Sequence, residues 1–218
     1  MNFKESDHIQ MLRDTLRKFI KNEMPKHLVR KWDQEDYFPK DVFKKLVDLG
    51  VTSLTVPEEY GGSGVDMVAA IATIEELSSR SIGMASAFIQ CSCYAGLNIL
   101  ESGSMEQKNE LLPRVANGEL LFSYGISEPD VGGDVASVLT IAKLDNDEVI
   151  INGSKRWCSG VLIANYIFTL VRSGPADERY RNLSIVLVPP DIKGISIIPQ
   201  NTMGLKGTGG TCDVYFDD

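Results

Sequence analysis

The stretch LLFSYGISEPDVGGDV, residues 120–135, marks a change of pattern along this chain of 218 residues. It begins with a short run of mostly apolar and aromatic side chains, which is typical of a β-strand. It continues with a proline, two adjacent glycines and three acidic residues, which together favour a loop. The residues before this stretch follow a helical pattern, and those after it follow a strand pattern.

Ahead of residue 120 the apolar residues recur at steps of three and four, which predicts amphipathic helices. In the first of them the apolar face consists of Ile9, Leu12, Leu16, Phe19 and Ile20. The expected helices cover about residues 4–24, a segment that starts after 39, then 67–78, 84–100 and a segment that starts at 104.

Several helix boundaries carry recognisable end signals. Pro25 is expected to stop the first helix. Gly50 follows the second expected helix, at a position where a residue with left-handed backbone conformation commonly ends a helix. Ser104 and Gln107 have the spacing of a capping box, in which each side chain bonds the other residue's amide. Pro113 is expected to kink or end that last helix.

From residue 120 onward, short runs rich in branched and aromatic residues alternate with turn residues, which predicts strands. Asn152-Gly153 lies between two extended runs and predicts a two-residue hairpin turn. The fold class is therefore α+β: an all-helical N-terminal domain, 1–119, and a small antiparallel β-barrel or sandwich domain, 120–218. The expected strands are 120–126, 139–144, 149–151, 166–171, 183–188, 195–198 and 212–216.

Composition argues against two classes of binding protein. The net charge of −8 and the absence of a basic stripe argue against nucleic-acid binding, which depends on clustered Lys and Arg. The four cysteines, at 91, 93, 158 and 212, form no C-x-x-C pair, and neither of the two histidines lies near them in the sequence. We therefore expect buried free thiols and no metal site.

The longest apolar stretch, about residues 83–100, is interrupted by Ser86, Gln90, Ser92 and Asn98. Because a membrane span needs roughly 20 mainly apolar residues, we expect a buried core helix and no span. The first residues lack the charged and apolar regions of a secretory signal, so a cytoplasmic location is expected.

The glycine-rich loop at 124–134 admits two interpretations. The common phosphate-binding patterns G-x-G-x-x-G and G-x-x-x-x-G-K-[ST] are missing, and the loop contains no lysine. It is either a connecting turn or a bed of backbone amides and hydroxyls. A bed of that kind suits a neutral, planar, acceptor-rich ligand, because amides can approach where no Cβ intervenes.

Trp157 also admits two interpretations. An indole in a strand usually fills a core, with its N–H bonded to a carbonyl. Alternatively it is a flat wall for a flat ligand, with the Ser159 hydroxyl two residues on and so on the same face of the strand.

Four segments, in order, resemble motifs of the acyl-CoA dehydrogenase family over essentially the whole chain. They are VPEEYGGSG (56–64), YGISEPDVGGD (124–134), INGSKRWCSG (151–160) and MGLKGTGGTCDVYFDD (203–218). The resemblance implies a flavoenzyme that uses FAD to oxidise an acyl-CoA thioester to its trans-2-enoyl form. In that chemistry a carboxylate removes the α-proton, and the β-hydrogen leaves as hydride to the flavin.

The resemblance also implies roles for individual residues. The loop residues Tyr124, Gly125, Ile126, Ser127, Gly132 and Gly133 would contact the cofactor. Trp157, Cys158 and Ser159 would hold the opposite part of the flavin, with Trp157 as a wall and the Ser159 hydroxyl near N5. Gly133 stands where the family usually has a serine that reaches the substrate's thioester arm. Glycine lacks that hydroxyl, so only its backbone amide remains to contact the substrate.

No catalytic residue is assigned within this chain. The family's base is a glutamate on a C-terminal helical domain, which is expected beyond Asp218, so the chain alone is expected to be inactive. Glu128 and Asp130 are expected to form the loop rather than to catalyse.

The expected partners are an acyl-CoA substrate, an electron-transfer flavoprotein as electron acceptor, and further copies of the chain in a dimer or tetramer. An acyl-CoA oxidase or an enoyl-CoA reductase of the same fold would show the same loops. A truncated, non-catalytic interaction protein is the alternative from a different class.

Overall fold

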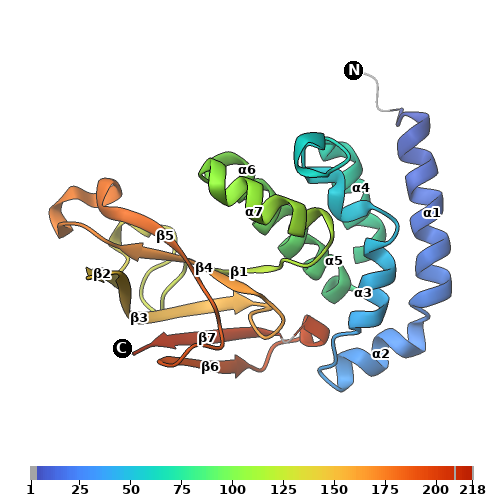
Figure 1. The fold of residues 1–218 in the computed structure, drawn as a ribbon. Coiled ribbons are helices and arrows are strands. Elements are labelled where there is room, and N and C mark those ends of the chain that lie inside the picture. Colours follow the sequence, from blue (N-terminus) through green and yellow to red (C-terminus); the bar gives the residue numbers. More distant parts are fainter. Residues whose placement is uncertain (1–3, 209, 218) are drawn as a thin grey trace. The chain divides into compact units, whose positions relative to one another are not determined.

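A computed structural model describes residues 4–208 and 210–217 of the chain. It contains two compact units, a helical one and a β one (Figure 1). The helical unit consists of Met1–Leu121 with Met203–Thr208, and the β unit of Phe122–Thr202 with Gly209–Asp218. The short segment at 203–208 thus belongs to the helical unit, although it follows most of the strands in the sequence.

The helical unit forms the helices that the apolar periodicity predicts, and one more. Helix α4 has the predicted bounds, whereas α2, which follows Pro25 directly, was not expected. The helices are α1 (Asp7–Glu23), α2 (Lys26–Gln34), α3 (Lys40–Val47), α4 (Met67–Ser78), α5 (Ile82–Phe88), α6 (Asn98–Ser102) and α7 (Met105–Ala116).

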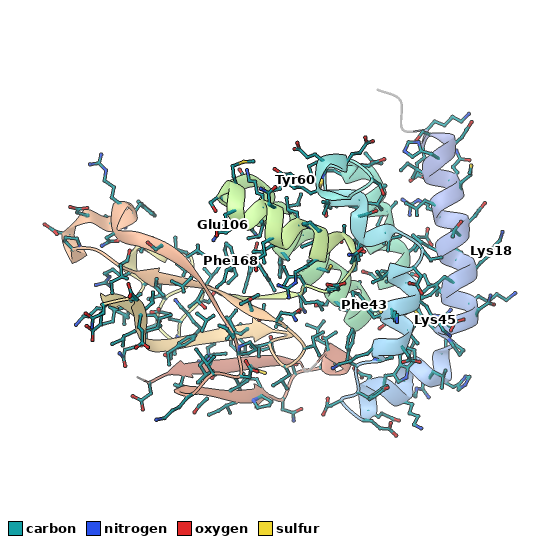
Figure 2. All side chains as sticks on the ribbon, viewed as in Figure 1. Lys18, Phe43, Lys45, Tyr60, Glu106 and Phe168 are labelled. Carbon is teal, nitrogen blue, oxygen red and sulfur yellow. The ribbon has the colours of Figure 1, made fainter. Side chains whose placement is uncertain are left out.

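The buried faces of these helices follow from their spacing. Leu16, Phe19 and Ile20 of α1 are buried as predicted. In α3, Phe43 is buried, whereas Lys45 is exposed and pairs with Glu23 at 2.6 Å (Figure 2). Alternation of buried and exposed positions at helical spacing therefore accounts for this unit.

Helix α7 confirms one boundary signal and corrects another. Both bonds of the capping box are present: Ser104 N–H donates to Gln107 Oε1 at 2.9 Å, and Gln107 N–H donates to Ser104 Oγ at 3.2 Å. The expectation that Pro113 ends this helix is wrong, because α7 continues to Ala116, whereas the alternative of a kink stays a prediction. Leu112 and Val115 are fully buried, and this packing holds the last turn in place despite the lost amide.

The apolar stretch predicted as a core helix is one continuous helix, Ile82–Ser102. Its middle part, Ile89–Leu97, is π-helical. The helix is long and apolar enough to cross a membrane, but 56% of its most apolar window is buried inside the protein. That burial is typical of a core helix.

The β unit contains strands close to those predicted. Leu183–Val188 has the predicted bounds. The strands are β1 (Phe122–Gly125), β2 (Ile141–Asp145), β3 (Glu148–Ser159), β4 (Tyr166–Arg172), β5 (Leu183–Val188), β6 (Ile195–Gln200) and β7 (Thr211–Phe216).

These strands form a curled mixed sheet rather than the purely antiparallel one expected. Their order is β1-β4-β2-β3-β7-β6, and β5 pairs with β4 (Figure 1). Strand β4 runs parallel to β1 and, at one residue pair, to β2, whereas the other pairings are antiparallel. The parallel pairs arise because the chain passes through the β2–β3 hairpin before it returns to pair with β1.

The expected hairpin turn at Asn152-Gly153 is wrong. Both residues lie within β3, where Asn152 pairs with Ile141 and Gly153 with Phe216. The turn between β2 and β3 instead contains Asn146, whose φ is 55°. At Gly153 φ is 144°, and a Cβ would lie 2.6 Å from Thr140 Oγ1, so the glycine permits a close approach of two segments.

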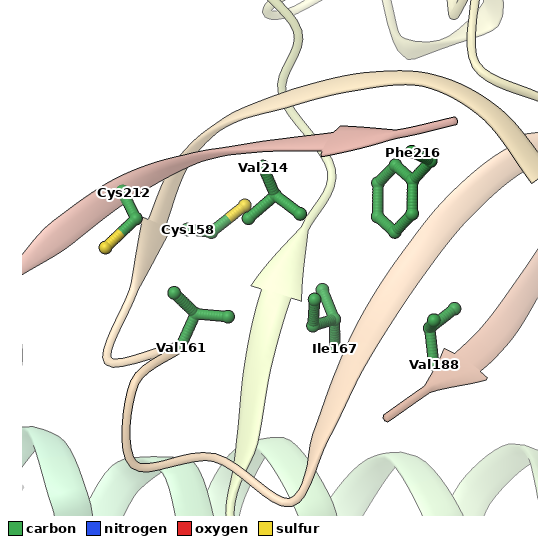
Figure 3. Close-up of a cluster of buried hydrophobic side chains, with 7 residues drawn as sticks. All are labelled: Cys158, Val161, Ile167, Val188, Cys212, Val214 and Phe216. Atoms are coloured by element: carbon green, nitrogen blue, oxygen red, sulfur yellow. The ribbon is translucent and has the colours of Figure 1, made fainter. Parts of the chain in front are cut away.

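The β unit has its own apolar core, built on the inner side of the curled sheet. Figure 3 shows its seven buried side chains: Cys158, Val161, Ile167, Val188, Cys212, Val214 and Phe216. Burial raises the pKa of the Cys158 thiol to about 12 and that of Cys212 to about 11. Both cysteines therefore behave as small apolar residues, as predicted.

Candidate functional site

A bulge in β3 carries Trp157. Lys155 pairs with Val214 and Cys158 with Cys212, so Arg156 and Trp157 together lie opposite Asp213. Trp157 has a φ of 63°, a left-handed conformation that costs a bulky residue about 1–2 kcal/mol. The residue is 55% exposed. The core-filling interpretation of this tryptophan is therefore wrong, and the indole is available to a ligand.

The predicted loop lies beside this bulge. Arg156 N–H donates to the Ser127 carbonyl at 2.8 Å. The two sequence segments that contain Ser127 and Trp157 therefore meet, although about thirty residues separate them.

The guanidinium of Arg156 lies against the indole. Its Cζ is 5.1 Å from the centroid of the Trp157 ring, within cation–π range. The same guanidinium donates to the two carboxylate oxygens of Asp213 at 3.3 and 3.4 Å. The cation nearest to the indole is thus already paired.

Tyr124 and Gly125 end strand β1. The Tyr124 ring packs on Phe168, with centroids 5.2 Å apart, which orients it within the sheet. Gly125 is buried, and a Cβ there would lie 2.9 Å from Ile167 Cγ2. Only glycine lets the strand pack this closely, so Gly125 has a structural role whatever the ligand.

Cys158 and Ser159 follow the bulge. The Cys158 thiol is fully buried in the core, so only its backbone can face a ligand. The Ser159 hydroxyl lies 2.6 Å from the Thr211 hydroxyl, and its carbonyl accepts from Ser123 Oγ at 3.0 Å. The simple alternation that placed Ser159 on the face of Trp157 does not apply here, because Trp157 has a left-handed backbone.

Gly132 and Gly133 lie at the exposed end of the loop. A Cβ at either position would meet nothing within 4 Å, and neither residue has a left-handed φ. The positive φ that glycine permits is therefore not used here. Just before these glycines, Glu128 and Val131 exchange both of their backbone hydrogen bonds.

A buried ion pair lies beneath the loop. Lys155 Nζ donates to Glu128 Oε1 at 2.8 Å, and their side chains are 0% and 3% exposed. The Glu128 carboxylate also accepts the backbone N–H of Leu139 at 2.7 Å and of Thr140 at 2.8 Å. Burial raises the pKa of Glu128, but the hydrogen bonds from Lys155, Thr140 and Leu139 outweigh it, so the pKa lies below its usual value. Glu128 thus remains an ionised acceptor of three hydrogen bonds that holds the loop.

These residues fit the planar ligand that the loop predicts. An exposed indole, a half-buried serine and two glycines without steric neighbours offer a flat apolar wall and accessible amides. A lysine from β3, Lys155, lies beneath the loop, but its charge is neutralised by Glu128. Within the described residues, no group of three His, Cys, Asp or Glu could hold a metal ion.

Comparison with known proteins gives the family. Residues 6–119 match the acyl-CoA dehydrogenase N-terminal domain, and residues 123–218 match the acyl-CoA dehydrogenase middle domain. The chain belongs to the acyl-CoA dehydrogenase family.

Its relatives in this family are considerably longer. The chain is 31% identical to a probable acyl-CoA dehydrogenase, YngJ, of Bacillus subtilis, of which it covers 57% while matching over its own full length. It is 37% identical to the mitochondrial isobutyryl-CoA dehydrogenase of Dictyostelium discoideum, over 90% of this chain and 47% of that protein. The chain thus spans about half the length of such relatives.

Solved acyl-CoA dehydrogenase structures share the fold. An acyl-CoA dehydrogenase from Geobacillus kaustophilus superposes with a TM-score of 0.90 at 25% identity, over all of this chain and 57% of the other. A glutaryl-coenzyme A dehydrogenase in complex with glutaryl-CoA gives 0.90 at 28% identity, over all of this chain and 55% of the other.

The sequence pattern does not reveal which residues support the loop at 124–134. Lys155 and Arg156 lie within the INGSKRWCSG segment without an evident role there, and the pattern indicates no partner for Glu128. A lysine within a strand-like run, two residues before the tryptophan, was the available signal. The role of this lysine follows only from its pairing with Glu128 in the tertiary structure.

Proposed function

We propose that this chain is the N-terminal and middle part of an FAD-dependent acyl-CoA dehydrogenase, which oxidises an acyl-CoA thioester to its trans-2-enoyl form. The observation that carries the proposal is the hydrogen bond from Arg156 to Ser127 beside the exposed indole of Trp157. It joins the two segments that the family resemblance assigns to the flavin.

Residues of the β unit would hold the cofactor. Backbone groups and the hydroxyl of Ser127, with the amides of Ile126, Gly132 and Gly133, would bind the acceptor edge of the flavin ring. Trp157 would cover the ring as a wall, and the Ser159–Thr211 hydroxyl pair would provide a donor. Donors held in place before charge arrives stabilise it without reorganisation.

FAD held by these residues would supply the acceptor for the hydride that leaves the substrate's β-carbon. The base that removes the α-proton is proposed to lie outside these 218 residues. Glu128 is unsuited to that task, because its carboxylate already accepts from a lysine and two amides in a buried position.

The proposed substrate class and partners follow the relatives. Names such as isobutyryl-CoA dehydrogenase and glutaryl-coenzyme A dehydrogenase support an acyl-CoA substrate. A chain in a structure named for the electron transferring flavoprotein of Acidaminococcus fermentans has a TM-score of 0.89 at 25% identity, which supports such a flavoprotein as electron acceptor. We also propose that the protein forms a dimer or tetramer. A cytoplasmic location is proposed as well, and the four free cysteines support it.

Substrate-dependent flavin reduction tests the activity. The longer gene product that contains this chain is loaded with FAD and mixed anaerobically with acyl-CoA thioesters of several chain lengths. Bleaching of the visible flavin band is expected. The activity would be wrong if no thioester bleached a flavin that is demonstrably bound, and release of hydrogen peroxide in air would instead favour an oxidase.

The tryptophan wall gives a second test. Trp157→Ala is expected to weaken FAD binding about ten-fold or more, because stacking on an aromatic side chain contributes about 1–3 kcal/mol. Trp32→Phe, in helix α2, is the control and should leave the dissociation constant unchanged. Equal FAD affinity of Trp157→Ala and the parent protein would remove Trp157 from the site.

A further inference from the structure

The Lys155–Glu128 pair makes contacts on both sides of the predicted flavin-contacting residue Ser127. Lys155 Nζ donates to the Ile126 carbonyl at 3.3 Å and to Glu128 Oε1 at 2.8 Å. The next strand residue, Arg156, donates its backbone N–H to the carbonyl of Ser127. Three consecutive loop residues are therefore each bonded to one of two consecutive residues of β3.

Glu128 extends this attachment to the far end of the loop. Its two carboxylate oxygens accept the backbone N–H groups of Leu139 and Thr140, eleven and twelve residues away. The segment between them contains Gly132 and Gly133. One carboxylate thus fixes both ends of the exposed glycine loop.

Stability alone does not account for a buried ion pair at this place. Removing two charges from water is costly, and an apolar pair of similar size is often equally stable or more so. What an apolar pair cannot provide is the directed set of bonds to Ile126, Leu139 and Thr140. Trp157 lies two residues beyond Lys155 in a strained backbone conformation, which persists only where neighbouring contacts fix it.

We propose that the Lys155–Glu128 pair is a positioning device, which holds the Ser127 loop against the Trp157 bulge and so sets the geometry of the ligand surface. The identity of the ligand, FAD, rests on the proposed function. The positioning role itself concerns the ligand-free protein.

The chain has two tryptophans, so Trp32→Phe leaves Trp157 as the single indole probe. In this background we compare Lys155→Met, Glu128→Gln and the double variant Lys155→Met/Glu128→Gln. Acrylamide quenching and near-ultraviolet circular dichroism report the Trp157 environment without FAD. Thermal unfolding reports stability, and FAD titration of the longer gene product carrying the same substitutions reports binding.

Each single variant is expected to lower the melting temperature, because it leaves a buried group unpaired. The double variant should regain much of that stability. Its Trp157 quenching and dichroism should nevertheless stay altered, and FAD should bind about ten-fold more weakly, the equivalent of about one hydrogen bond. If the pair only stabilised the fold, the Trp157 signals and FAD affinity of the double variant would recover together with its melting temperature.

Two further variants complete the test. Lys45→Met removes a lysine from the exposed pair with Glu23 and should change neither Trp157 signal. Glu128→Asp keeps the charge but shortens the side chain, so it should alter Trp157 quenching even if the double variant fails to fold.

The positioning role would be wrong if the double variant and Glu128→Asp both showed the parent protein's Trp157 quenching and dichroism. Failure of the parent protein to bind FAD would count against the proposed function instead. The ligand-free measurements would still decide the role of the pair.

Discussion

Two glycines of the β unit illustrate how differently the same residue type is used. Gly153 lies inside β3 with a φ of 144°, and a Cβ would lie 2.6 Å from Thr140 Oγ1. Gly133, at the position where the family usually has serine, has open space around it and no left-handed φ. The fold requires glycine at position 153, whereas packing and backbone conformation do not require it at position 133.

Gly153→Ala and Gly133→Ser should therefore differ in their effect on stability. We expect Gly153→Ala to lower the free energy of unfolding by about 1–3 kcal/mol through backbone strain and steric contact. Gly133→Ser should stay within about 0.5 kcal/mol of the parent chain. Urea denaturation measures both, and a comparable loss in Gly133→Ser would show that the loop is more crowded than described.

Among the elements, α7 and the β3 bulge show where local signals suffice and where they do not. The capping box of α7 forms as its two residues predict. In β3 the Asn-Gly pair reads locally as a turn, but pairing on both sides keeps it extended. The bulge that exposes Trp157 has no local signal of its own.

Ser104→Ala is expected to destabilise the helical unit by about 1 kcal/mol, because it removes the side chain that accepts the Gln107 amide. Ser102→Ala, at the exposed end of α6, is the matched control and should have almost no effect. Thermal unfolding followed at 222 nm distinguishes them. Equal effects of the two variants would mean that the cap contributes nothing.

At the scale of the whole molecule, both units depend on ionised acids. In the helical unit burial raises the pKa of Glu76, but hydrogen bonds from Arg17 and Arg13 outweigh it and leave the pKa lowered. In the β unit the pKa of Glu128 is lowered by the contacts described above. A lowered folded-state pKa stabilises the fold above the unfolded-state pKa, and this contribution is lost as the pH falls through the folded-state value.

Stability should therefore decrease from about pH 5 downward, as the pH falls through the range in which free carboxyl groups titrate, roughly 4, and on to the lowered folded-state values. Glu128→Gln should be less stable than the parent chain at pH 7 and should lose less between pH 5 and pH 3. Melting temperatures of both proteins, measured across this range, test whether stability falls with pH as expected. An acid dependence of Glu128→Gln as steep as that of the parent would exclude Glu128 as a contributor.

The sequence by itself determined the types and order of most elements, the capping box, the burial of Cys158 and Cys212, and the family motifs. These depend on side-chain periodicity and on interactions a few residues long. Only the tertiary structure decided the parallel pairing of β1 with β4, the extended conformation of Asn152-Gly153, the exposure of Trp157, and the union of Lys155 with Glu128. Those features join residues such as 128 and 155, 27 apart in the chain. Their free energy comes from burial and pairing with distant neighbours, which local propensity does not encode.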